Sequence, residues 1–306
     1  MKVIVILGPT AVGKTKLSVE LAKRLHGEVI NADSTQVYQD MNIATAKVTE
    51  EEKENIPHHL FDIKRMTEDY SVSDYQKDVR VVIEDCIKRG KTPILVGGTG
   101  LYIKAALYDY QFAPTSYKGD YHTFTNEELY QQLLEISPNT KIHKNNRKRV
   151  ERALDYYHET HQVLEDKEKT EELLYPTIFI GLTCDRNLLY DRINQRVDVM
   201  VRSGLLDEAK KIYDSNIRTK AVMTPIGYKQ LFPYFEGTKS LEDCLEEIKK
   251  DSRHYAKRQY TFFKHQLPVH WLTVNFEQFD QTVQEALDYV CRKGSMSSSV
   301  GGTKNK

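Results

Sequence analysis

Residues Gly8–Thr15 read GPTAVGKT and match the phosphate-binding pattern G-x-x-x-x-G-K-[ST] at every fixed position. In this pattern the backbone N–H groups of a glycine-rich turn surround a pyrophosphate, the Lys supplies positive charge, and the Ser or Thr hydroxyl holds Mg²⁺. The sequence therefore predicts a diphosphate site whose last residue is a magnesium ligand. The candidate binding residues are Gly8, Pro9, Thr10, Ala11, Val12, Gly13, Lys14 and Thr15.

The residues on either side of this loop supply the context that the motif requires. Lys2–Leu7 (KVIVIL) is a short apolar run of the kind that forms a buried parallel strand. Behind the loop, Leu17, Leu21 and Leu25 recur every four residues, as on one face of a helix. The N-terminus of such a helix directs free N–H groups and the positive end of its dipole at a bound phosphate. A chance glycine-rich turn is therefore a poor explanation of the motif.

The composition of the chain excludes some classes of protein but does not indicate a binding partner. The chain has 306 residues with 44 Lys and Arg against 44 Asp and Glu, so net charge gives no argument for nucleic acid. The four cysteines are far apart and predict neither a disulfide framework nor a zinc site, which fits a reducing cytoplasm. The pair His58–His59 lacks further ligands at metal-binding spacing and is interpreted as part of a loop. Neither a signal peptide nor a membrane span is expected.

The first third of the chain alternates strand and helix. Apolar runs at Glu28–Asn31 and Pro93–Val96 read as strands, and Val72–Arg89 has helical periodicity and stops at Gly90. This alternation predicts an α/β fold with a parallel sheet, with ligands at the carboxyl ends of its strands. The expected core is that of the P-loop nucleotide kinases.

The alternation breaks after Leu107. Residues 108–175 are polar and tyrosine-rich, with two helical stretches, Asn126–Ile136 and Asn145–Glu159, and no convincing strand. Strand signals return at Thr177–Leu182 and Val269–Val274. The expected organisation is a discontinuous α/β core (residues 1–107 and 176–293), a helical insertion (108–175) and a disordered Gly/Ser-rich tail (294–306).

The second strand leads into a polar segment, Asn31–Tyr38 (NADSTQVY). A carboxylate at this strand end lies beside the phosphate loop, so Asp33 could accept a proton from an incoming nucleophile. The alternative is a loop or helix-capping Asp. The neighbouring Ser34, Thr35 and Gln36 could hydrogen-bond the edge of an unpaired base.

A third strand end carries the turn Gly97–Gly100 (GGTG). A kinase-like protein usually places an acidic metal-binding residue here, whereas this turn offers only the Thr99 hydroxyl and backbone N–H groups. The missing carboxylate counts against ATP hydrolysis as the main chemistry. A plain strand-to-helix turn is the alternative.

Two basic helices could contact anions. In the insertion, Lys144, Lys148 and Arg152 repeat every four residues, which suits a nucleic-acid backbone but is also usual on a solvated helix face. In the predicted helix Asn187–Val201, Arg192 and Arg196 lie one turn apart. Arginines there could neutralise a leaving diphosphate. Arg196 is the stronger candidate, and an ordinary surface position is favoured for Arg192.

Taken together, these stretches resemble the tRNA dimethylallyltransferase family, also called isopentenyl-tRNA transferases. The resemblance spans nearly the whole chain before the tail, in the family's order. It is carried by GPTAVGKT, NADSTQVY, ATAK (44–47), ILVGGTGLYIKAAL (94–107), NNRKRVERALDYY (145–157), RVDVMVRSGLLDEA (196–209), PIGYKQL (225–231) and YAKRQYTFFK (255–264).

The resemblance implies transfer of a dimethylallyl group from dimethylallyl diphosphate to N6 of the adenosine 3′ of the anticodon. It implies that Thr10–Thr15 contact the prenyl diphosphate with Mg²⁺ on Thr15, and that Asp33 orients N6 and takes its proton. The base is expected to leave its stack to reach the site. The implied tRNA contacts are Asp33, Ser34, Thr35, Gln36, Thr99, Lys148, Arg149, Val150, Glu151 and Arg152.

Departures from the family pattern are few. YTFFK stands where the family more often ends with a Trp and an Arg. No Cys/His zinc finger of the eukaryotic type follows, so a bacterial-type enzyme is expected. We also expect the enzyme to be monomeric and cytoplasmic. Two alternatives stay open: a P-loop kinase or adenylate prenyltransferase acting on free nucleotides, and a nucleotide-switched RNA-binding factor. The basic insertion argues against the first and Asp33 against the second.

Overall fold

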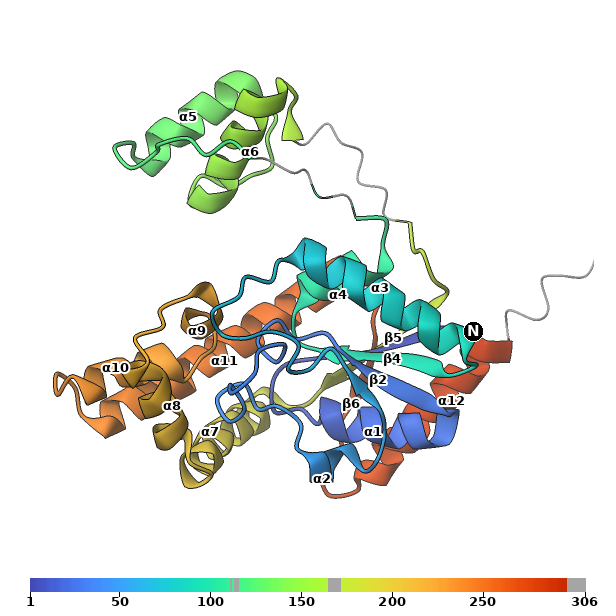
Figure 1. Cartoon of the computed structure of the whole chain (residues 1–306). Coiled ribbons are helices and arrows are strands. Elements are labelled where there is room, and N and C mark those ends of the chain that lie inside the picture. Colours follow the sequence, from blue (N-terminus) through green and yellow to red (C-terminus); the bar gives the residue numbers. More distant parts are fainter. Residues whose placement is uncertain (111, 113–115, 165–171, 296–306) are drawn as a thin grey trace, which may run out of the picture. The chain divides into compact units, whose positions relative to one another are not determined.

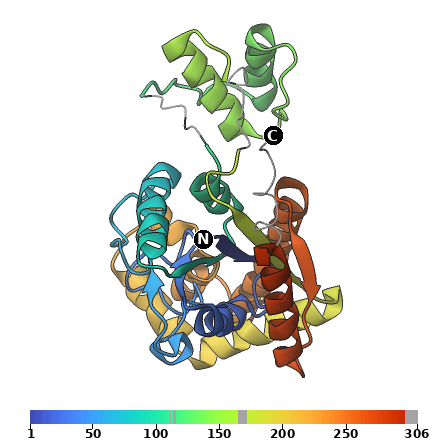
Figure 2. The ribbon, with the colours of Figure 1, turned by 90° about the vertical axis from the view of Figure 1, so that its right-hand side faces the viewer.

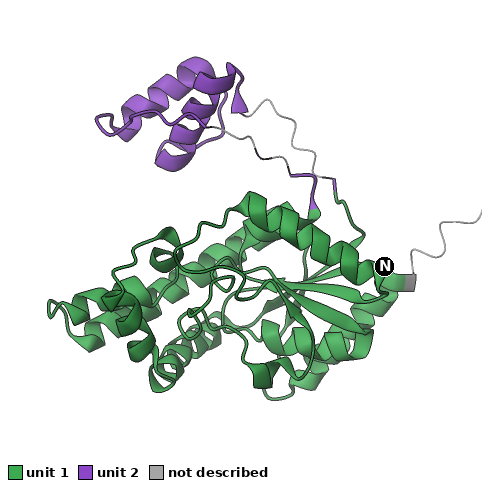
Figure 3. Cartoon of the chain, in the orientation of Figure 1, with its two compact units in different colours: residues 1–107, 173–306 green, residues 108–172 purple. Residues whose placement is uncertain are grey.

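The computed structural model describes residues 1–110, 112, 116–164 and 172–295, so the expected tail lies outside it from residue 296 on. The chain forms two compact units, Met1–Leu107 with Leu173–Lys306 as unit 1, and Tyr108–Glu172 as unit 2 (Figure 3). The last helix of unit 1, α12 (Phe279–Ser295), continues past Gly294, where the sequence predicts the tail to begin.

Unit 1 is built on a six-stranded sheet in which every pair of neighbouring strands is parallel. The strand order is β3-β2-β4-β1-β5-β6. The predicted α/β fold with a parallel sheet is therefore confirmed. Their bounds are Val3–Leu7 (β1), Gly27–Asn31 (β2), His58–His59 (β3), Thr92–Gly97 (β4), Thr177–Thr183 (β5) and His270–Thr273 (β6).

Strand β3 is one of the elements that the sequence does not predict. His58 and His59 pair with Val29 and Ile30 of β2 at the edge of the sheet, in place of the loop expected there. A strand of two residues is too short to show the alternation by which strands are recognised.

Helices cover both faces of this sheet, as Figures 1 and 2 show. Helix α1 (Lys14–Leu25) and α12 pack on one face, where Ile4 and Ile6 of β1 join Leu17 and Leu21 in one apolar core. Helices α3 (Val72–Lys88) and α4 (Gly100–Leu107) cover the other face. Both faces of β1 are thus buried, which explains its unbroken apolar sequence.

Helices α7 to α11 form a second apolar cluster with residues of the segment that follows β2. Short helix α2 precedes β3, while α7 to α11 follow β5, with α7 and α11 the longest. Their bounds are Glu50–Lys53 (α2), Arg186–Arg202 (α7), Leu205–Asp214 (α8), Lys220–Met223 (α9), Tyr228–Phe235 (α10) and Leu241–Gln266 (α11).

One carboxylate joins three stretches of this cluster. Glu208 of α8 accepts hydrogen bonds from the backbone N–H groups of Asn42, Ile43 and Ala44, at 2.9–3.1 Å. It also accepts one from the hydroxyl of Tyr228, a fully buried residue at the start of α10. The loop that opens the ATAK stretch is thus fixed to α8 and α10 by the acidic residue of LLDEA.

Replacing Glu208 with Ala is expected to lower the free energy of unfolding by about 2–4 kcal/mol, because backbone donors and the Tyr228 hydroxyl lose their acceptor. Urea unfolding measures the change. Asp207→Ala is the matched control, since Asp207 is exposed on the same helix and should change stability by no more than about 0.5 kcal/mol. Equal effects of the two substitutions would show that the Glu208 contacts contribute nothing specific.

Unit 2 is a small helical unit with a core of its own. Helix α5 (Asn126–Ile136) begins at a capping box in which Thr125 and Glu128 bond each other's backbone. Helix α6 (Arg147–Thr160) packs against α5 through an apolar cluster that includes Leu129, Leu133 and Leu154.

The chain leaves and re-enters unit 1 at one place. Leu107 is the last residue before unit 2, and its carbonyl accepts a hydrogen bond of 2.8 Å from the N–H of Leu174. The two connections of the insertion are therefore adjacent where they meet unit 1.

Candidate functional site

A pocket of about 830 Å³ lies at the carboxyl ends of β1, β2 and β4 of unit 1. Its walls come from the phosphate loop, the segments that follow β2 and β4, and the helices α7 and α11. A parallel sheet gathers its ligand-binding residues at this edge because the loops after its strands converge there. Thr10–Thr15, Asp33–Gln36, Thr99 and Arg196 all line this one pocket.

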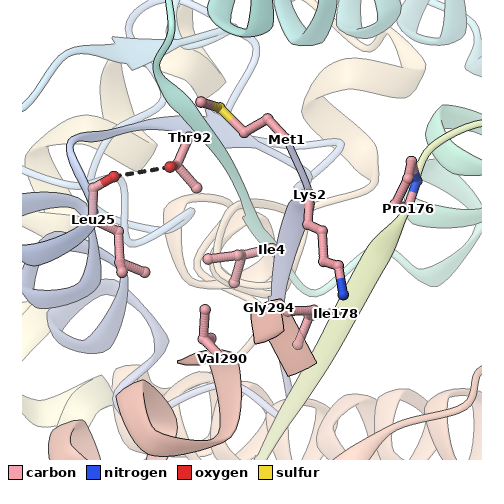
Figure 4. A pocket seen from close by; sticks show the side chains of 9 residues that line it. All are labelled: Met1, Lys2, Ile4, Leu25, Thr92, Pro176, Ile178, Val290 and Gly294. Atoms are coloured by element: carbon pink, nitrogen blue, oxygen red, sulfur yellow. Dashed lines mark hydrogen bonds between the residues drawn. The ribbon is translucent and has the colours of Figure 1, made fainter. Parts of the chain in front are cut away.

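A second pocket, of about 390 Å³, lies at the opposite ends of the strands (Figure 4). Ile4, Ile178 and Val290 point into it from β1, β5 and α12, and the Thr92 hydroxyl is bonded to the Leu25 carbonyl at its rim. Apart from Lys2 and Thr92 this lining is apolar, and it contains no carboxylate, imidazole or thiol. The candidate chemistry therefore belongs to the larger pocket.

The phosphate loop owes its shape to two glycines. Gly8 has φ +145°, and a Cβ there would lie 2.6 Å from the carbonyl oxygen of Leu182. Gly13 has φ +97° and precedes the first turn of α1. Gly8 and Pro9 do not line the pocket, so their predicted part in binding is indirect: Gly8 allows the close approach to β5, and the Pro9 carbonyl accepts a 2.7 Å hydrogen bond from Lys14 Nζ.

The environment of Lys14 favours the neutral form of its side chain. Burial lowers the pKa of its ammonium group to about 7; the nearby Arg196 guanidinium acts in the same direction and Asp33 opposes both. A buried cation without a full counter-charge favours binding of an anion, which would restore the ordinary pKa. The site thus has a deficit of negative charge next to the loop amides.

Two arginines of α7 reach the same loop. Arg196 Nη1 donates to the Thr10 hydroxyl at 3.2 Å, and burial lowers the pKa of this guanidinium. Arg192 Nε donates to the Ala11 carbonyl at 3.1 Å, with its guanidinium 3.7 Å from the centre of the Phe276 ring. The surface position favoured for Arg192 by the sequence is wrong, because Phe276, far along the chain, covers the arginine. Both side chains are available to an anion in the loop.

Asp33 lines the same pocket as these cations. Its Oδ1 accepts hydrogen bonds from the Thr35 backbone N–H at 3.0 Å and from the Thr35 hydroxyl at 2.7 Å. Its own N–H donates to the Asn31 side chain, which also holds the Leu60 carbonyl. Within the described part of the chain, Oδ2 of Asp33 accepts no hydrogen bond, so the carboxylate is oriented through one oxygen and open at the other.

The segment after Asp33 is tied to the GGTG turn. The Ser34 N–H donates to the Thr99 hydroxyl at 3.1 Å, and the Thr99 N–H donates to the Ala32 carbonyl at 3.2 Å. Gln36 uses its amide to hold the Thr45 and Ala46 carbonyls. The side chains of Thr35, Gln36 and Thr99, which are predicted to contact tRNA, thus already bind the protein and hold these segments of the pocket together.

The donor atoms around Thr15 suit a small hard cation. The Thr15 side chain lines the pocket, and among the described residues its hydroxyl has no hydrogen-bond partner. The open oxygen of Asp33 and the Glu52 side chain line the same pocket. Hydroxyl and carboxylate oxygens, completed by phosphate oxygens and water, are what Mg²⁺ prefers.

Unit 2 presents only part of the predicted RNA-binding stretch. Lys148, Arg149 and Arg152 are exposed on α6. Val150 is fully buried in the core of the unit, and Glu151 accepts a 2.6 Å hydrogen bond from Arg147. The exposed part of the predicted contact stretch is therefore the three basic side chains, because the face of the helix that carries Val150 packs into the core of the unit.

Comparison with known proteins adds a family to this geometry. A family model described as IPP transferase matches residues 36–266. The chain belongs to the IPP transferase family. The tRNA dimethylallyltransferases of Anoxybacillus flavithermus and Geobacillus thermodenitrificans are 47% and 44% identical to it, and each alignment covers 98% of this chain and 99% of the relative. The resemblance drawn from the sequence motifs is confirmed.

Solved structures of this family agree in fold. The tRNA isopentenylpyrophosphate transferase of Bacillus halodurans has a TM-score of 0.76 and 42% identity, with 98% of both chains covered. A eukaryotic dimethylallyltransferase described as acting on tRNA has a TM-score of 0.83 and 32% identity, with 95% of this chain and 80% of that chain covered.

Sequence reasoning missed what α11 contributes to the transferase pocket. Tyr255, Arg258 and Gln259 line it, although the sequence motif YAKRQYTFFK indicated only the family resemblance and no site residue. Burial raises the pKa of the Tyr255 hydroxyl, which also interacts with Thr99 and Gln259. Polar residues spaced four apart on an otherwise apolar helix face, as Tyr255 and Gln259 are, would have been the signal.

One further group of potential metal ligands is already occupied. Glu28, His59 and Cys86 lie close together at the edge of the sheet. Glu28 accepts hydrogen bonds from both terminal nitrogens of Arg89 and pairs with His59 at 2.7 Å, and these partners lower the pKa of Glu28 to about 2. The transferase thus uses this carboxylate as an ion-pair partner.

In the described residues no helix is long and apolar enough to cross a membrane.

Proposed function

We propose that this protein transfers the dimethylallyl group of dimethylallyl diphosphate to N6 of the adenosine 3′-adjacent to the anticodon, position 37, in tRNAs that read codons beginning with U. The family supports prenyl transfer to tRNA by an enzyme of the transferase class. One observation supports the division of roles most directly: a single pocket is lined by both the cationic phosphate loop and the half-open carboxylate of Asp33.

The reaction breaks the allylic carbon–oxygen bond of the donor and forms a carbon–nitrogen bond to N6. The electron pair of the broken bond leaves with the diphosphate, where Lys14, Arg196 and the loop amides stabilise the charge that develops. The open oxygen of Asp33 accepts the proton that N6 loses. Bound Mg²⁺, held by Thr15, would further neutralise the diphosphate. A stacked base cannot reach this pocket, so the adenine is extruded from the anticodon loop.

The deciding experiment incubates the protein with unmodified tRNA, Mg²⁺ and either dimethylallyl diphosphate or ATP, with AMP as an alternative acceptor. Nucleosides are then identified by mass. We expect dimethylallyl adenosine in tRNA from the prenyl donor, and no product from AMP. Phosphate transfer from ATP, or prenylation of AMP in preference to tRNA, would contradict the proposal.

We also propose that the enzyme acts as a monomer in the cytoplasm, where its tRNA substrates are found.

The exposed cations of α6 supply a prediction about tRNA binding. Reversing both charges, Lys148→Glu with Arg149→Glu, is expected to weaken tRNA binding at low salt. It should also reduce the slope of log affinity against log salt by about one to two, because phosphate contacts are lost. Lys77→Glu with Lys88→Glu on α3 makes the same charge change at exposed positions of unit 1. A double variant on α6 that titrates like this control would place the tRNA backbone elsewhere.

A further inference from the structure

A single buried side chain connects the two sides of the pocket. Gln259 of α11 is 5% exposed. Its Oε1 accepts a hydrogen bond of 3.1 Å from the Thr10 backbone N–H, and its Nε2 donates one of 3.1 Å to the Gly98 carbonyl. The partners fix which end of the amide faces which loop, because an N–H can only donate and a carbonyl can only accept.

The two partners of Gln259 belong to opposite halves of the proposed reaction. Thr10 lies on the phosphate loop, and its hydroxyl accepts the hydrogen bond from Arg196. Gly98 precedes Thr99, whose hydroxyl holds the Ser34 backbone next to Asp33. The bridge is therefore a direct connection between the part that would hold the leaving diphosphate and the part that would hold the base.

The fit around this bridge is tight. A Cβ at Gly98 would lie 2.0 Å from Gln259 Nε2 and 3.6 Å from the open Oδ2 of Asp33. The Gln259 amide thus leaves no room for a side chain at Gly98, and the open oxygen of Asp33 lies close to the same point.

We propose that Gln259 is a positioning residue that sets the separation between the phosphate loop and the GGTG turn, and hence between the prenyl donor and the general base. The inference rests on the proposed function. Gln259 occupies the Thr10 N–H, so the diphosphate is left with the amides farther along the loop. Reacting groups held at a fixed separation gain rate, and a misplacement of about 1 Å can cost about 10²-fold.

The first test is Gln259→Glu, which keeps size and shape. An ionised carboxylate at this position would place an oxygen next to the Gly98 carbonyl oxygen, and the two acceptors would repel each other. A protonated carboxyl group can accept from the Thr10 N–H and also donate to the Gly98 carbonyl. We expect the ratio of variant to wild-type single-turnover rates to rise as the pH falls. The rise should reach about tenfold per pH unit above the pKa of the introduced carboxyl, which burial and the facing carbonyl raise.

The second test is Gln259→Met, which removes both hydrogen bonds at similar volume. We expect kcat to fall about 10- to 100-fold while KM for the prenyl diphosphate changes less than about threefold, because alignment and not affinity is lost. Gln266→Met is the matched control, since Gln266 is exposed on the same helix. Thermal unfolding shows whether the variants are folded.

The outcomes separate the inference from the function on which it rests. If wild type prenylates tRNA and both Gln259 variants match it at every pH, the inference is overturned and the function stands. If wild type transfers no prenyl group, the function is overturned, and hydrogen exchange of the peptide spanning residues 8–15 still decides the inference. Faster exchange in Gln259→Met than in wild type and in Gln266→Met supports the bridge, and unchanged exchange overturns it.

Discussion

Asp33→Ala is expected to lower the single-turnover rate of prenyl transfer to tRNA by at least about 10²–10⁴-fold, the usual contribution of a general base. The structure shows the reason: one oxygen of Asp33 is fixed by two hydrogen bonds from Thr35, and the other is open in the pocket. Binding of tRNA should stay within about twofold of wild type, because α6 supplies the exposed cations. Rapid-quench transfer and filter binding measure the two quantities.

Two variants test whether this loss reflects proton transfer. Asp33→Asn retains an oxygen that can accept from Thr35, so it should keep the local structure and still lose activity. Glu51→Gln neutralises an exposed carboxylate that does not line the pocket and should leave the transfer rate within about threefold of wild type. Transfer at the wild-type rate by Asp33→Asn would remove Asp33 as the base and assign it to positioning alone.

Lys14→Met is expected to reduce affinity for inorganic pyrophosphate about 100-fold or more, since the charge is buried and forms part of the phosphate cradle. Lys16→Met is the matched control. Lys16 lines the same pocket, but its ammonium lies 4.7 Å from the centre of the Phe279 ring. Calorimetry of pyrophosphate binding gives both values. A loss at Lys16 equal to that at Lys14 would show a diffuse charge effect and not a specific contact.

The lowered pKa of Lys14 also predicts how the affinity for pyrophosphate changes with pH. In the free protein the ammonium is charged below about pH 7 and loses its proton above it. Since the charged form binds the anion, affinity should fall as the pH rises through that value, by up to about tenfold per unit, with a proton taken up on binding. Lys14→Arg stays charged throughout. The ratio of wild-type to Lys14→Arg affinities should therefore decline with rising pH, and a flat ratio would contradict the assignment.

The parts of the site that could be predicted are those encoded within a few residues. GPTAVGKT specifies a loop, and the apolar run before it and the leucines behind it specify the strand and helix that hold it. Asp33 could be placed because parallel strands end at one edge of a sheet, so residues following β1 and β2 meet there whatever the rest of the chain does.

The parts that escaped prediction depend on pairs distant in sequence. In the sequence Arg192 is indistinguishable from a surface residue, because Phe276, which covers it in the structure, lies far along the chain. The helix pattern likewise gives Gln259 no function, because its amide partners Thr10 and Gly98 are distant in sequence. On α6, a run of five residues looked like one contact surface, whereas helix geometry buries Val150 and pairs Glu151 with Arg147. A motif lists its residues but does not say which way each one faces.

The hydrogen bond between Leu174 and Leu107 makes the transferase modular. A segment whose two ends are joined by backbone hydrogen bonds, Leu174 to Leu107 and Asp109 to Glu172, needs no particular length or shape, because a short turn could join the same residues. Everything between them is free to lengthen, shrink or change its surface charge without altering the sheet, the phosphate loop or Asp33. Selection for a different RNA could therefore act on one contiguous stretch of the gene while the chemistry stays constant.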